Sequence, residues 1–89
     1  MKVTRKNLAQ KLIDYLYHHI TLSELVKWAE TSMMEADFEE NDYETLKDIT
    51  SRLGLADVKA FGVTWDDCKD FLQRLGYHVD LKVTEMRAV

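Results

Sequence analysis

The sequence predicts a mainly α-helical fold, a compact domain of four helices with one short β-strand near its C-terminal end. Three observations predict this class. Apolar residues recur at helical spacing in four segments, residues suited to capping and glycines bound these segments, and apolar and polar residues alternate strictly over residues 77–83. A chain of 89 residues fits one domain, for which we expect residues 1–84, followed by a frayed tail at 85–89.

The first helix is expected to start after Thr4, a good N-cap residue, and to run to about His18. His19 falls on the apolar side of this helix, where we expect a packed ring rather than a metal ligand, and His18 falls on the polar side. Residues 1–3 fit either the end of a strand or a ragged terminus. The apolar side consists of Leu8, Leu12, Tyr15, Leu16 and His19.

The second helix has the best-specified start in the chain. Thr21 and Glu24 form the pattern of a capping box, in which each side chain accepts a hydrogen bond from the backbone N–H of the other residue. Trp28 lies beside the apolar stripe of this helix, so it is either a surface anchor for a partner or second-layer core. The stripe consists of Leu22, Leu25, Val26, Ala29, Met33 and Ala36.

The third helix is expected over residues 42–53, because residues 41–44 repeat the capping pattern. Gly54 then suits the left-handed conformation that commonly follows a helix. Asp48 and Arg52 stand four positions apart, which predicts an ion pair along the helix surface. The core-facing residues of this helix are Leu46, Ile49 and Leu53.

The last part of the chain predicts a turn, a helix and a strand. Residues 55–61 fit either a helical turn or a short strand, and we favour the turn. The fourth helix follows Thr64 and runs to Leu75, with Gly76 as its stop. The strand over residues 77–83 then needs a partner for its backbone groups. The candidate partners are residues 1–4, residues 56–61 and the same strand of a second copy.

Charge is distributed unevenly along the chain. Residues 1–27 carry a net charge of +3, whereas residues 28–70 carry −8. This balance argues against nucleic-acid duplex binding through a basic face and favours a basic protein partner or a cation. The chain has no apolar run long enough to span a membrane and no signal-peptide core, so we expect a cytoplasmic protein.

The acidic link, residues 35–44, carries six carboxylates in ten residues. Capping and the helix dipole explain the acids from residue 41 onward, because they lie at the positive end of the third helix. The first half lies at the negative end of the second helix, where the same dipole disfavours carboxylates. We therefore predict a contact surface for a protein partner here. The predicted partner-binding residues are Trp28, Glu35, Asp37, Phe38, Glu39 and Glu40.

The link also has some features of a calcium-binding loop between two helices. Its departures are specific: Asp42 stands where the sharp turn of such a loop requires glycine, and Asp48 stands where a longer glutamate supplies bidentate reach. Calcium binding is therefore an alternative to partner binding. Its ligands would include Asp37, Glu39, Asn41 and Asp48.

No catalytic constellation emerges from the sequence. Cys68 lies on an apolar helix face among aspartates, so a buried core thiol is favoured over a nucleophile with His78 as its base. We expect no enzyme activity and no cofactor. A third possibility is a homodimer joined through the C-terminal strand, by the residues Tyr77, Val79, Leu81 and Val83.

Overall fold

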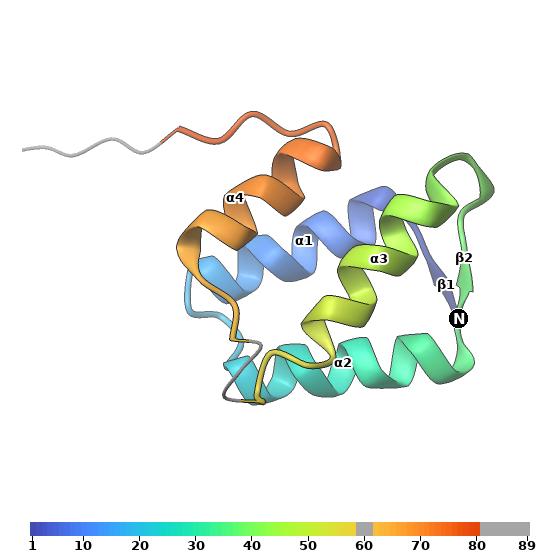
Figure 1. Ribbon diagram of the computed structural model, residues 1–89, viewed down its shortest axis with the longest axis horizontal. Coiled ribbons are helices and arrows are strands. Elements are labelled where there is room, and N and C mark those ends of the chain that lie inside the picture. The colour runs from blue at the N-terminus through green and yellow to red at the C-terminus, as the bar shows by residue number, and fades with distance from the viewer. Residues whose placement is uncertain (59–61, 81–89) are drawn as a thin grey trace, which may run out of the picture.

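The computed structural model of the chain describes residues 1–58 and 62–80 (Figure 1). Within these ranges the fold is mainly α-helical with four helices, as predicted, and it adds a pair of two-residue strands. None of the described helices combines the length and the apolar character needed to cross a lipid bilayer. The elements in order are β1 (Lys2–Val3), α1 (Arg5–Leu16), α2 (Leu22–Glu35), β2 (Asp37–Phe38), the 3₁₀ turn η1 (Glu40–Asp42), α3 (Tyr43–Leu53) and α4 (Trp65–Arg74).

Capping boxes start three of the helices, at Thr4, Thr21 and Thr64. In each, the threonine hydroxyl accepts a hydrogen bond of 3.1 Å from a backbone N–H three residues later. These bonds satisfy amide groups that the first helical turn leaves unpaired, so the three starts confirm the sequence prediction. The start of α3 is different, because Asp42 forms no side-chain cap and η1 leads into the helix instead.

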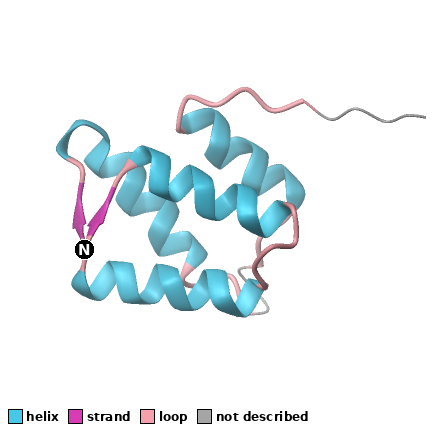
Figure 2. Cartoon of the chain, turned by 180° about the vertical axis from the view of Figure 1, so that it is seen from behind, coloured by secondary structure: helices cyan, strands magenta, loops and turns pink. Residues whose placement is uncertain are grey.

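The core lies where the four helices meet (Figure 2). α2 and α3 form the most extensive helix pair. The predicted inward side of α3 is confirmed, since its three core-facing residues are fully buried. Val3 of β1 is also buried, so the N-terminal strand belongs to the core. The largest fully buried side chains include Phe71, Leu8, Leu12, Leu25, Leu46, Ile49 and Leu53.

The end of α1 corrects the sequence prediction. The helix ends at Leu16 rather than near His18, and His18 takes the left-handed conformation with φ of 62°. The N–H groups of His18 and His19 then bond back to the carbonyls of Tyr15 and Asp14 at 3.1 and 2.8 Å. This early turn takes the His19 side chain off the apolar face, so that it is 70% exposed rather than packed.

Gly54 and Gly76 behave differently although both follow helices. Gly76 has φ of +89°, as its predicted role as a stop implies. Gly54 keeps helical angles, φ −65° and ψ −15°, so its predicted left-handed conformation is wrong. The chain instead leaves α3 through consecutive turns, in which the N–H of Ala56 bonds to the carbonyl of Leu53 and that of Val58 to Leu55. Residues 59–61 of the predicted turn lie outside the described residues.

Ion pairs join α3 to α4 instead of running along α3. Asp48 pairs with Arg74 at 2.9 Å, and Arg52 lies 3.8 Å from Asp67. The predicted pair between Asp48 and Arg52 is therefore replaced by two contacts between helices. Side chains four residues apart can meet on a helix, but here each reaches an opposite charge on the neighbouring helix.

The only strands in the described ranges form a parallel pair of β1 and β2, with Lys2 opposite Asp37 and Val3 opposite Phe38. The predicted C-terminal strand is not seen: residues 77–80 have no regular secondary structure, and residues 81–83 lie outside the described ranges. The alternation of apolar and polar residues that predicted this strand has another cause. Tyr77 and Val79 are half-buried against the helical core while His78 and Asp80 are exposed, so an extended segment packs on the helices without a sheet partner.

Candidate functional site: an acidic groove beside β2

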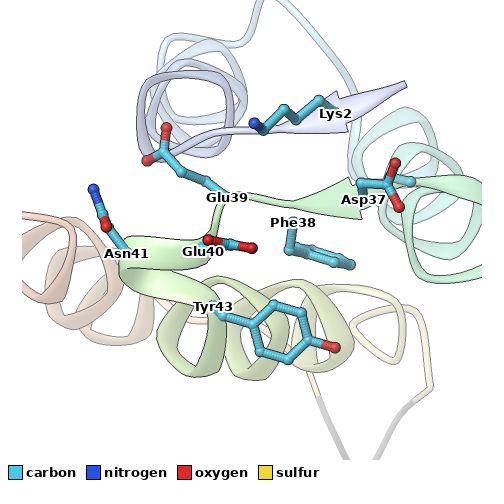
Figure 3. Close-up of a pocket in the computed structure, with 8 residues that line it drawn as sticks. Lys2, Asp37, Phe38, Glu39, Glu40, Asn41 and Tyr43 are labelled. Atoms are coloured by element: carbon cyan, nitrogen blue, oxygen red, sulfur yellow. The ribbon is translucent and has the colours of Figure 1, made fainter.

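An open hollow of about 700 Å³ lies beside β2 and the start of α3 (Figure 3). We call it the acidic groove. Three carboxylates, two aromatic rings and one lysine reach it from β1, β2, η1 and α3. It is lined by Lys2, Ala36, Asp37, Phe38, Glu39, Glu40, Asn41 and Tyr43.

The end of α2 creates this groove. Ala36 leaves the helical conformation for an extended one, φ −89° and ψ 150°, and the next two residues pair with β1. Glu35 is therefore the last residue of α2, and Glu39 lies beyond β2 with φ of −55° and ψ of 131°. Glu35 and Glu39 stand four positions apart and would repel one another on a continuing helix, but the helix ends at Glu35.

The carboxylates of the acidic link form no ion pair within the described part of the chain. Across residues 1–58 and 62–80, none of the six link acids is within ion-pair distance of a basic side chain. Four aspartates elsewhere lie within that distance of a basic side chain, Asp48 and Asp67 of an arginine and Asp14 and Asp80 of a histidine. The lining of the acidic groove holds three carboxylates and a single cation, Lys2, so the groove carries a net negative charge.

The floor of the groove is aromatic. The rings of Phe38 and Tyr43 meet edge to face, with centroids 6.2 Å apart and planes at 84°, and Figure 3 shows them side by side below β2. Lys47 lies 5.4 Å from the centroid of the Tyr43 ring and donates a 3.3 Å hydrogen bond to its hydroxyl. Tyr43 is 42% exposed, so the groove offers apolar contact area beside its charges.

Four of the six predicted partner-binding residues, Asp37, Phe38, Glu39 and Glu40, come together in this groove. Glu35 is exposed at the end of α2 but does not line it. Trp28 lies apart from the groove: it is half-buried against the core, and its ring has Lys11 5.7 Å from its centroid. The second-layer interpretation of Trp28 therefore fits its position.

Sequence reasoning missed Lys2 and Tyr43, and it named Asn41 only as a metal ligand. Lys2 reaches the groove because β1 pairs with a segment 35 positions away, and no local pattern indicates that pairing. Tyr43 had a usable signal: it is a large aromatic residue among carboxylates at a helix start, which is a common composition for an interface anchor.

The candidate calcium ligands do not converge. The Asp48 carboxylate is turned toward α4, where it pairs with Arg74. Asp37 and Glu39 flank Phe38 at β2, and Asn41 lies in η1. Within the described ranges no three histidine, cysteine or acidic side chains are grouped closely enough to hold a metal ion.

Two other predicted groups have positions that limit their chemistry. Cys68 is fully buried, and burial together with the nearby charge of Asp67 raises the pKa of its thiol to about 11. The thiolate that a nucleophile requires is thus disfavoured. Of the predicted dimer residues, Tyr77 and Val79 already pack against the core of the same chain, and Leu81 and Val83 lie outside the described residues.

The fold and the groove together define a small helical domain with one acidic, aromatic-floored concave surface. No protein-family model, curated protein or solved structure matches the chain. Function is therefore inferred from the groove itself.

Proposed function

We propose that this protein is a non-enzymatic interaction module that binds a basic protein partner through the acidic groove. The observation that supports the proposal best is the set of groove carboxylates without cationic partners in the described ranges, at Asp37, Glu39 and Glu40. Like charges along one stretch of backbone repel one another, and a cationic partner would relieve that repulsion.

The aromatic floor supports a protein partner over a free cation. Phe38 is half-buried and Tyr43 is partly exposed, so apolar groups of a partner can cover them while lysine or arginine side chains meet the carboxylates. Aromatic anchors surrounded by polar groups are the usual arrangement of residues that dominate binding energy. Charge on the rim would mainly raise the association rate, and this gain would fall with added salt.

The proposal is tested by comparing two variants with the same change in charge. The groove variant carries Asp37→Asn, Glu39→Gln and Glu40→Gln, and the control carries three neutralised exposed acids outside the groove. The control substitutions are Glu30→Gln, Asp57→Asn and Asp70→Asn.

We expect the immobilised wild-type and control proteins to retain the same basic proteins from a cell lysate at low salt. The groove variant should retain at least about tenfold less of them, since each charge contact is worth on the order of 0.5–1 kcal/mol at such a surface. Equal retention by the groove variant and the wild type would show that the acidic groove is not the binding surface.

A further inference from the structure

The backbone of β2 has one unpaired edge. Pairing with β1 uses the N–H groups of Asp37 and Glu39, which donate 3.0 Å bonds to the carbonyls of Met1 and Val3. Because a parallel ladder joins alternate residues, the N–H and C=O of Phe38 point away from β1. Neither group bonds to another residue in the described ranges. Such an edge is the template on which an extended segment adds as a further strand.

The acidic groove follows the stretch of backbone that carries this edge, and Lys2 of β1 also lines it. Six of its lining residues are the consecutive residues 36–41, so the hollow runs along one stretch of backbone instead of crossing several helices. Figures 1 and 2 show β2 at one end of the molecule, with β1 on the side of the helices. An extended peptide matches a groove of this form, whereas a helical partner would need anchoring pockets one helical turn apart.

Side-chain charge complements the backbone edge. Asp37 and Glu39 project to the same side of the strand, since side chains alternate along extended backbone, and Phe38 projects to the other side. β1 already shows the matching pattern, because Lys2 and Val3 pair in register with Asp37 and Phe38. A strand added to the free edge of β2 would complement β2 if it had the same residue order as β1, a cation followed by an apolar residue. The carboxylates also oppose pairing with a second β2, which is acidic itself.

We propose that the partner presents an extended segment in which lysine or arginine alternates with apolar residues, and that this segment binds beside β2 as a third strand. Its backbone pairs with the N–H and C=O of Phe38. Its cations lie near Asp37 and Glu39, and its apolar side chains cover the rings of Phe38 and Tyr43. The inference rests on the proposed function, because it specifies how a basic partner occupies the same groove.

The test uses the blocked peptide Lys-Val-Lys-Val-Lys and two N-methylated forms of it. One form carries methyl groups on the amides of one edge of the extended peptide, and the other carries them on the opposite edge. Only one edge can face β2, so methylation there should weaken binding about tenfold through lost hydrogen bonds, while methylation of the opposite edge should have little effect. Nuclear magnetic resonance titration of the full chain gives the affinities, and amide exchange should slow at Phe38.

The outcomes separate this inference from the proposed function. Suppose that the unmethylated peptide binds the wild type, that it binds the groove variant more weakly, and that methylation of neither edge changes its affinity. The added strand is then wrong and the acidic groove stands. If the peptide binds the groove variant and the control variant equally well, both proposals fail. A peptide that shows no binding at millimolar concentration also overturns the added strand, and the lysate comparison then decides the proposed function independently.

Discussion

At the scale of single residues, two helix ends adopt the same hydrogen-bonded turn with different residues at its critical position. Gly76 follows α4 with φ of +89°, and His18 follows α1 with φ of 62°. In both, the next residue donates a backbone bond to the carbonyl five positions earlier, at 2.9 Å for Tyr77 and 2.8 Å for His19. Left-handed backbone is free of steric cost for glycine and costs other residues about 1–2 kcal/mol.

We therefore predict that His18→Gly raises the free energy of unfolding by about 1 kcal/mol, measured by urea denaturation. The loss of His18 contacts is minor, because its side chain lies at an exposed position. The matched control is Gly76→Ala, which should destabilise the protein for two reasons. Alanine would have to adopt the left-handed φ of Gly76, and its Cβ would stand 2.8 Å from Arg5 Nη1. A destabilised His18→Gly would mean that the turn does not strain this residue.

The ends of helices were harder to predict than their starts for the same local reason. A capping box needs one threonine and one polar partner three residues later, so Thr4, Thr21 and Thr64 mark their helices in the sequence alone. A left-handed terminus is indicated by glycine, and His18 carries no such signal. Gly54 shows the converse, because a glycine can also keep helical angles.

At the scale of elements, an ion pair on the protein surface joins α3 to α4. Asp48 and Arg74 are 2.9 Å apart, with side chains 53% and 36% exposed. Pairs at this exposure are screened by solvent and contribute modestly.

A double-mutant cycle with Asp48→Asn and Arg74→Gln should give a coupling energy of about 0.5 kcal/mol in low salt, falling toward zero at about 1 M salt. Chemical denaturation of the four proteins measures it. Arg52→Gln is the comparison, because Arg52 stands one helical turn from Asp48 but lies 3.8 Å from Asp67 instead, so its coupling with Asp48→Asn should be smaller. A cycle with no coupling between Asp48 and Arg74 would leave that pair without a role in joining the helices.

The groove shows where sequence patterns reach their limit. Asp37, Phe38, Glu39 and Glu40 were predicted because charge and an aromatic residue accumulate within a few positions, which is visible in the sequence. Lys2 was not, because its place depends on pairing between strands of two residues each. Segments that short carry no periodicity, so tertiary packing decides whether they pair.

At the scale of the whole molecule, the buried thiol of Cys68 makes stability depend on pH in the alkaline range. The pKa of Cys68 is raised from 9.0 to about 11 by burial and by the charge of Asp67. The unfolded chain therefore loses this proton first, between about pH 9 and 11, and proton loss favours unfolding there.

Stability should fall across this range by roughly 2 kcal/mol through Cys68, and below about pH 9 the group should have little effect. Urea unfolding at a series of pH values measures the slope. Cys68→Ala is expected to be less stable at neutral pH because of the cavity it creates, yet to show a shallower decline above about pH 9. Parallel slopes for the two proteins would contradict this linkage.

The pairing of β1 with β2 also affects the order in which the molecule assembles. It joins Val3 to Phe38 across the whole length of α1 and α2. Closing a loop of that size costs entropy that two short strands cannot recover alone, so α1 and α2 must pack first. We therefore expect the acidic groove to form late in folding and to be among the first regions that open in local unfolding.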